Sequence, residues 1–348
     1  MAENKKTMID LLHHVYMEKR SKSDTKALEL LPGKVVSDFK KGKKTDLDYK
    51  QQWLLHKYFH SVCVLEAGLD IIYGEEKLRS QPQKIKQDWC DALLMHDIGR
   101  AYEVNYQGKR ILKYPHGTLG MEMLHRQGIQ SPHILLPILM HDRIHFDIFA
   151  LKPEEIMTDS HFANVPDKVK GTIKSLMEQY YKMDKKEQEA IRLGCRMLVD
   201  ADQLANLKDF DKMLNLSRYE KRPEISQEVR QAIKEGHLVN YKDLKTYPDE
   251  AVAYMAWMFD GNFPSFRNEL VENDLLNKMR HFVIKKMIQN DPTKDFKDLD
   301  IELQKMQRIV EKNIHSKMRP FDNNAKEFDK EKQRVLGKVL QSRAKGKN

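Results

Sequence analysis

Apolar residues recur at the three-to-four-residue spacing of an α-helix through most of this 348-residue chain. The pattern covers residues 47–68, 89–98, 118–127, 134–141, 169–183 and 187–207. Between these segments lie glycines and prolines, which interrupt helices: Gly74, Pro82, Gly108, Gly128, Pro153 and Pro166. The only strand candidate is a short one at residues 102–111. The spacing therefore predicts an all-α fold.

Pro137 limits where the helix at residues 134–141 can begin. Proline lacks the backbone N–H that a helix interior uses, so it is tolerated in the first turn. We therefore expect this helix to begin close to Pro137.

Positive charge is concentrated at the two ends of the chain. The net charge is +9, of which residues 1–50 carry +4 and residues 304–348 carry +8, so the middle carries −3. A nucleic-acid-binding domain has its basic face on the fold itself, which argues against one here. We expect a basic helical N-terminal extension and linker at residues 1–47, a main domain at 48–285 and a charged basic helical tail at 286–348. The basic ends are candidates for weak contact with a polyanion.

The cysteines and the absence of long apolar runs indicate a cytoplasmic protein. No apolar run approaches the roughly 20 residues that a membrane span requires. The first residues lack the apolar core of a secretory signal. Three scattered cysteines, Cys63, Cys90 and Cys195, favour reduced thiols over a disulfide framework.

A histidine and an aspartate, His96 and Asp97, follow an apolar stretch that begins at Leu93. Adjacent side chains on a helix point about 100° apart, so these two could flank a metal ion at the end of their helix. One such pair arises easily by chance, but four further residues of types that bind divalent metals accompany it. These residues are His60, His116, His141 and Asp202.

This order of residues resembles the HD-domain superfamily of metal-dependent phosphohydrolases. The resemblance covers roughly residues 48–285 and is specific for the superfamily rather than for any substrate. It rests on the segments His60–Val62, Met95–Arg100, Pro115–Gly120, Ile138–Arg143 and Asp200–Asn206. The resemblance implies an HD-domain helical bundle with additional C-terminal helices. It also implies a set of metal ligands: His60, His96, Asp97, His116, His141 and Asp202.

The superfamily pattern also distinguishes between neighbouring candidates. His60 is preferred over His56, one turn earlier, because the sequence Ser-Val follows it as in the superfamily's first motif. Asp202 is preferred over Asp200 because a polar residue and then leucine follow it, as they follow the final ligand of that pattern. Asp200 stays an alternative.

A second His-Asp pair, His141 and Asp142, competes with the first. It lacks the Ile-Gly that follows His96 and Asp97, so we prefer the first pair. A minimal site of this superfamily holds one ion with four ligands. The two further histidines, His116 and His141, are typical of members that hold two ions. Alternatively, they line the pocket and contact phosphate.

Imidazole and carboxylate ligands suit Fe, Mn, Co, Ni or Zn, so we expect one or two divalent transition-metal ions. The resemblance implies a phosphodiesterase or phosphatase. In it, Asp97 bridges the ions and a metal-bound hydroxide attacks a small phosphorylated substrate such as a nucleotide. Arg100 and Arg143 are candidates for binding its phosphate, or else for salt bridges with nearby acids. The alternatives are a mixed-valent di-iron HD oxygenase and a non-catalytic metal-binding sensor or scaffold.

Overall fold

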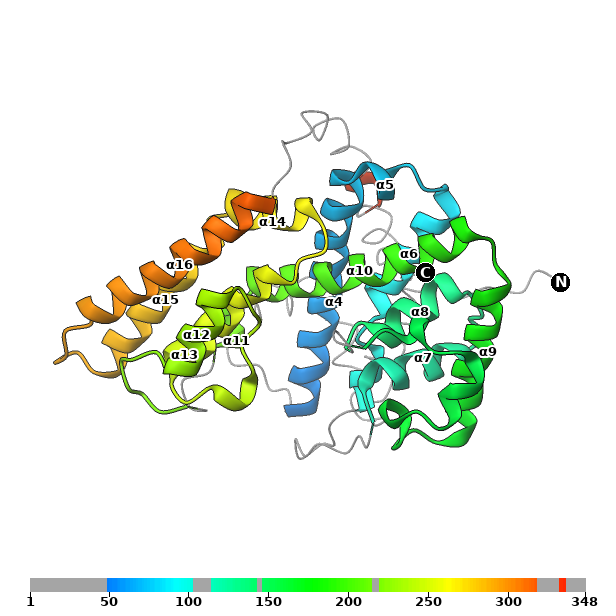
Figure 1. Cartoon of the computed structure of the whole chain (residues 1–348), viewed down its shortest axis with the longest axis horizontal. Coiled ribbons are helices and arrows are strands. Elements are labelled where there is room, and N and C mark those ends of the chain that lie inside the picture. The colour runs from blue at the N-terminus through cyan, green and yellow to red at the C-terminus, as the bar shows by residue number, and fades with distance from the viewer. Residues whose placement is uncertain (1–48, 103–113, 143–145, 215–218, 318–331, 336–348) are drawn as a thin grey trace, which may run out of the picture. The chain divides into compact units, whose positions relative to one another are not determined.

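The computed structural model, shown in Figure 1, describes residues 49–102, 114–142, 146–214, 219–317 and 332–335. Within these ranges all regular secondary structure is helical, and the predicted all-α fold is confirmed. One isolated bridge joins Glu220 to Thr246. The strand candidate at residues 102–111 lies outside the described residues, apart from Tyr102. The N-terminal extension at 1–47 and most of the chain after 317 lie outside them as well.

The chain forms two compact units, and helix α10 passes from one to the other. The first unit comprises the described residues up to Val199 together with 332–335. Its elements are α4 (Tyr49–Gly74), α5 (Glu76–Arg79), α6 (Gln83–Met95), the 3-10 helix η2 (Ile98–Tyr102), α7 (His116–Arg126), α8 (Pro132–Met140), the 3-10 helices η3 (Ile148–Ala150), η4 (Pro153–Met157) and η5 (Ser160–Phe162), α9 (Asp167–Lys182) and the first part of α10 (Lys185–Lys208).

Close packing in the first unit depends on small residues at helix crossings. Helix α4 packs on α6, α6 on α8, and α8 on α7 (Figure 1). A Cβ at Gly68 on α4 would lie 2.4 Å from Leu93 on α6, so glycine allows these two helices to approach. Gly194 on α10 leaves room in the same way for Trp89, which is fully buried. This packing holds the ends of α6 and α8 in fixed positions.

Helix α8 differs from the sequence prediction. It begins at Pro132, so Pro137 lies in its second turn, and the expected start near Pro137 is wrong. The N–H that Pro137 lacks would have bonded to the carbonyl of His133. All nine residues of the helix are buried, and this burial offsets the missing bond. The backbone nitrogen of His141 still donates to the carbonyl of Pro137 at 3.0 Å, so the helix continues past the proline.

The second unit begins at Asp200 and is built around helix α13. Its elements are the rest of α10, α11 (Phe210–Met213), α12 (Gln227–Glu235), the 3-10 helix η6 (Tyr241–Asp243), α13 (Tyr247–Ala256), the 3-10 helix η7 (Trp257–Phe259), α14 (Pro264–Glu272), α15 (Leu275–Asn290) and α16 (Lys297–Lys317). All ten residues of α13 are buried, and it contacts α12, α15 and α16.

Helix α15 crosses the boundary that the sequence predicts at residue 285, and α16 lies beyond it. That residue lies inside α15, and α16 begins twelve residues after it. Leu303, Met306 and Val310 on α16 are buried in the second unit. The residues up to 317 therefore form part of a packed unit.

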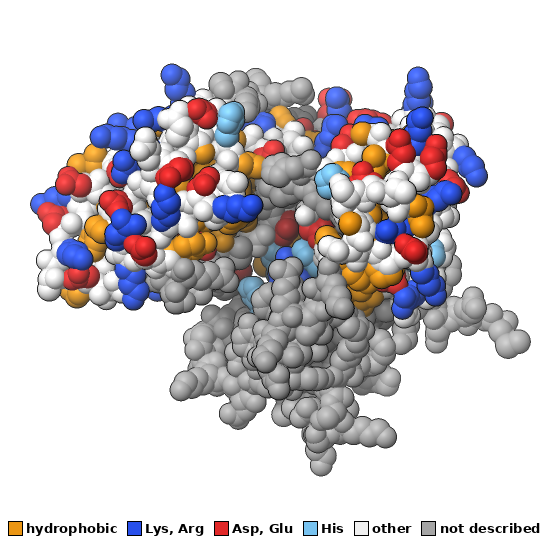
Figure 2. Space-filling view, turned by 60° about the horizontal axis from the view of Figure 1, so that its bottom comes forward, with side chains coloured by type: hydrophobic (Ala, Val, Ile, Leu, Met, Phe, Trp, Pro, Cys, Tyr) orange, Lys and Arg blue, Asp and Glu red, His pale blue; other side chains and the backbone are white. Residues whose placement is uncertain are grey.

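Charged side chains lie on the surface of each unit in Figure 2, as expected where the apolar side chains are buried inside. Acidic and basic side chains are interspersed over the face of each unit that Figure 2 shows. Among the helices that are described, none combines the length and the apolar character that crossing a bilayer requires.

Candidate metal centre

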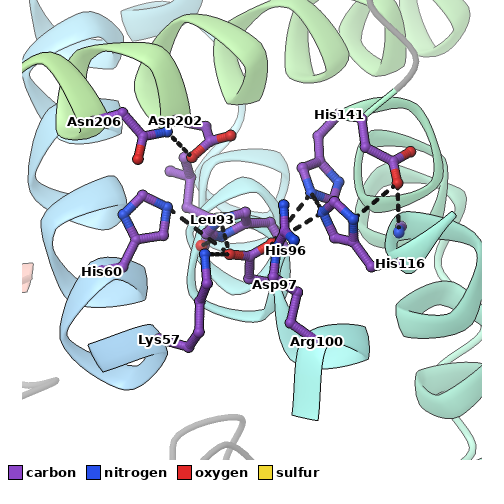
Figure 3. A network of polar contacts seen from close by, with 12 residues as sticks. Lys57, His60, Leu93, His96, Asp97, Arg100, His116, His141, Asp202 and Asn206 are labelled. Carbon is purple, nitrogen blue, oxygen red and sulfur yellow. Dashed lines mark hydrogen bonds and ion pairs between the residues drawn. The ribbon is translucent and has the colours of Figure 1, made fainter. Parts of the chain in front are cut away.

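Four helices of the first unit bring their predicted ligands to one place (Figure 3). Helix α6 ends at Met95, and His96 and Asp97 follow it directly; α8 ends at Met140, and His141 follows it in the same way. His116 is the first residue of α7, and His60 lies within α4. All five side chains are buried. Packing thus collects residues that are widely separated in the sequence.

Gly99 determines how closely α7 approaches Asp97. A Cβ at Gly99 would lie 2.1 Å from the carbonyl oxygen of His116 and 2.8 Å from the backbone nitrogen of Gly120. Because both of these atoms belong to the backbone, no rotation of a side chain could make room for a larger residue. The glycine that follows the His-Asp pair therefore allows His116 to reach the site.

Asp97 lies between two groups of histidines. Its Oδ2 is 3.7 Å from Nε2 of His96 and 3.9 Å from Nε2 of His60. Its Oδ1 is 3.1 Å from Nε2 of His116 and 3.6 Å from Nε2 of His141. Within each group the donor atoms lie within 4.8 Å of one another. A carboxylate shared between two groups of imidazoles is an arrangement that could hold two metal ions.

Backbone carbonyls fix the orientation of two of these rings. Nδ1 of His96 lies 2.8 Å from the carbonyl oxygen of Leu93, and Nδ1 of His141 lies 2.7 Å from that of Ile138. A carbonyl only accepts hydrogen bonds, so Nδ1 donates and Nε2 of the neutral ring keeps its lone pair. Leu93 and Ile138 lie in the last turns of their helices, where carbonyls lack a helical partner. Each ring thus has the tautomer that a metal ligand needs.

Asp142 orients His116. Its Oδ2 accepts a hydrogen bond from the backbone nitrogen of Gly117 at 3.0 Å and lies 3.2 Å from Nδ1 of His116. Nε2 of His116 then lies only 2.9 Å from Nε2 of His141. If both rings carry their proton on Nδ1, the two Nε2 lone pairs at this distance repel each other unless a cation lies between them. Two donors that bind one ion at about 2.1 Å and at right angles are about 3.0 Å apart, so this pair fits a transition-metal ion.

The protonation states of the cluster also suit metal binding. Burial lowers the pKa of His116, although its contact with Asp97 opposes the shift, and the neutral ring is the form that binds metal. Burial also works against ionisation of Asp97. The positive charges of Arg100 and Lys57 outweigh it and hold the pKa of that carboxyl well below its usual value.

Two basic side chains contact Asp97 directly. Lys57 Nζ donates to Oδ2 at 2.8 Å, and Arg100 Nε donates to Oδ1 at 2.9 Å. Lys57 lies three residues before His60 on α4, so the two share a face of that helix. Arg100 is thus placed at the cluster, where it forms the salt bridge that the sequence left as its alternative role. Arg143 lies outside the described residues.

The two candidate aspartates after residue 199 belong to the second unit. Asp200 is buried and accepts hydrogen bonds from the backbone and side chain of Asn262 and from the backbone of Phe263. These bonds tie Asp200 to the segment that precedes α14. Asp202 accepts a hydrogen bond from Asn206 at 3.0 Å, and its role as a ligand stays a prediction.

Two residues of the cluster were missed by the sequence reasoning, Asp142 and Lys57. The sequence presents Asp142 only as half of a rival metal-binding pair, whereas the structure divides that pair between two roles. His141 joins the cluster and Asp142 orients His116. The sequence offers one signal for Lys57: it lies three residues before His60, so the two side chains share a face of a helix.

Comparisons of the chain with models of known families, with curated proteins and with solved structures found no match. The geometry of the site and the order of its ligands in the sequence therefore carry the functional conclusion.

Proposed function

We propose that the protein is a metal-dependent phosphohydrolase that acts on a nucleotide or another small phosphoester. The observation that carries this proposal is the buried carboxylate of Asp97, which lies between two groups of imidazoles. Lys57 and Arg100 bring positive charge to the same carboxylate, and basic groups of this kind bind phosphoryl oxygens. The resemblance of the ligand order to the HD-domain superfamily supports the same class.

Each group of histidines would hold one divalent ion together with one oxygen of Asp97. Such ions supply a bound hydroxide near neutral pH and offset the charge on the phosphoryl oxygens. Arg100 is the more exposed of the two basic residues, and its planar guanidinium can bind two phosphoryl oxygens of a substrate at once. Asp142 would hold the proton of His116 on Nδ1. Nε2 of that ring would then keep its lone pair and face Asp97.

Metal content gives the first test. Elemental analysis of protein purified without chelator should find one or two transition-metal ions per chain, drawn from Fe, Mn, Co, Ni and Zn. His116→Ala should lower that content, because it removes a ligand of one group. His125→Ala, on the same helix but on its last turn, is the matched control and should leave the content unchanged. A wild-type chain that binds none of these metals would contradict the proposal.

Hydrolysis gives the second test. Protein loaded with Mn²⁺ or Fe²⁺ should release product from phosphomonoesters, phosphodiesters or nucleotides in the absence of oxygen. Asp97→Asn should abolish this turnover, whereas Asp91→Asn, a control on helix α6 just before it, should retain it. Turnover that requires oxygen and releases no hydrolysis product would contradict the proposal and favour a di-iron oxygenase.

A further inference from the structure

Each oxygen of the Asp97 carboxylate is shared between histidines and one basic side chain. Oδ2 accepts from Lys57 at 2.8 Å, and Oδ1 accepts from Arg100 at 2.9 Å. The same oxygens face the two histidine groups described above. A metal ion that binds either group through Asp97 therefore meets a basic side chain already on that oxygen.

Formal charge makes this competition strong. With neutral imidazoles, the carboxylates of Asp97 and Asp142 balance the charges of Lys57 and Arg100. Each divalent ion would add two positive charges to a buried cluster, and like charges a few ångströms apart repel strongly where water is excluded. An anion that binds together with the ions would offset that charge.

We infer that Lys57 competes with a metal ion for Oδ2 of Asp97, and that phosphate relieves this competition by becoming the partner of the ammonium group. Metal and phosphate then bind more tightly together than either does alone, and the coupling is reciprocal. This inference rests on the proposed metal centre. It assigns the phosphoryl group of the substrate as the anion that completes the site.

Lys57 suits this role better than Arg100. Its side chain is 11% exposed against 26% for Arg100, so Lys57 is the more deeply buried cation. A lysine ammonium on its flexible four-carbon stem can turn from a carboxylate to a nearby anion. Arg100 donates to Asp97 through Nε, and its planar guanidinium carries further N–H donors, so it can bind an anion while keeping that contact.

Binding of Mn²⁺ to the full chain, measured with and without inorganic phosphate, tests the coupling. In the wild-type protein, phosphate should tighten Mn²⁺ binding by about 5- to 150-fold, the usual range for coupled ligands. Lys57→Met should bind Mn²⁺ more tightly than wild type without phosphate, and phosphate should then have an effect at least about fivefold smaller. Lys57→Arg keeps the charge and should retain the coupling.

Lys170→Met is the matched control. The side chain of Lys170 on α9 is also 11% exposed, and it contacts Asp167 and the carbonyl of Met157. This variant should leave Mn²⁺ affinity and coupling unchanged. Circular dichroism checks that each variant is folded, and Lys57→Gln replaces Lys57→Met if the latter unfolds.

The outcomes separate the two proposals. A wild-type chain that binds no Mn²⁺, Fe²⁺, Co²⁺, Ni²⁺ or Zn²⁺ overturns the metal centre itself. Mn²⁺ binding that phosphate does not affect in wild type overturns the coupling alone. A phosphate effect that persists at full size in a folded Lys57→Met or Lys57→Gln protein overturns the role of Lys57.

Discussion

Gly99→Ala adds one methyl group at the point where η2 meets the first turn of α7. That methyl carbon would lie 2.1 Å from the carbonyl oxygen of His116, whereas ordinary contact begins at 3.4 Å. The backbone must therefore separate by about 1 Å, because rotation of a side chain cannot relieve a clash with a carbonyl. His116 would move away from Asp97 and His141 together with the backbone of its helix.

Overpacking of this kind destabilises a protein by about 1–3 kcal/mol, and a clash with backbone atoms places Gly99→Ala at the upper end of that range. For a unit of this size, 1 kcal/mol corresponds to a fall of about 2–4 °C in Tm. We therefore expect Tm to fall by about 6–12 °C. Thermal unfolding, followed by circular dichroism with chelator and with Mn²⁺, measures both the loss of stability and the loss of metal binding.

Gly171→Ala is the control for this change. Gly171 lies within α9, and a Cβ there would meet no atom within 4 Å. Alanine in a helix interior is more stable than glycine by about 0.5–1 kcal/mol, so this variant should have a slightly higher Tm and an unchanged response to Mn²⁺. A Gly99→Ala protein with the Tm and Mn²⁺ response of wild type would refute the close approach of η2 and α7.

Three further changes separate the roles of other residues. Asp97→Asn leaves two basic side chains without their carboxylate and should lower the metal-free stability by about 3–5 kcal/mol at pH 7 in urea unfolding. Because the folded-state pKa of Asp97 lies below its unfolded value of about 3.9, the carboxylate contributes fully above that pH. Its contribution is lost as the pH falls towards the folded-state pKa, so the deficit of Asp97→Asn should shrink in acid. Asp142→Asn should weaken Mn²⁺ binding by about 10- to 100-fold in calorimetry with the helical signal intact, since it replaces the carboxylate that orients His116 with a neutral amide. A chain that ends after Leu303 should lose the cooperative unfolding of the second unit, whereas one that ends after Lys317 should keep it, because Met306, Val310 and Ile314 of α16 are buried and lie between these ends.

Helical periodicity, which is local in the sequence, predicted the all-α fold, and the resemblance of the ligand order indicated the residues that the cluster brings together. Helical periodicity depends on residues three and four apart, and it found the helices that carry His60, His96 and His141. The missed residues act across long separations. Lys57 reaches a residue 40 positions away, and Asp142 binds the backbone nitrogen of Gly117, 25 positions away. Such contacts depend on how helices pack, which no local pattern encodes.

Burial explains the remaining differences between prediction and structure. Pro137 disfavours a helix interior by its local chemistry, but tertiary contacts over the whole of α8 override that preference. The charged composition after residue 285 suggested a separate tail. The buried residues of α16 recur at helical spacing along one side of the helix, and this apolar face packs into the second unit.

His96 and His141 share one arrangement, in which each ring bonds to the carbonyl three residues earlier in its own helix. The direction of each imidazole is therefore determined as soon as the helix forms, and binding an ion need not order the ring again. Only the convergence of the helices requires the rest of the protein. Because the arrangement uses nothing beyond a histidine and a carbonyl that every helix end leaves unbonded, it can be transferred to designed bundles, where histidine-terminated helices would act as interchangeable ligand units.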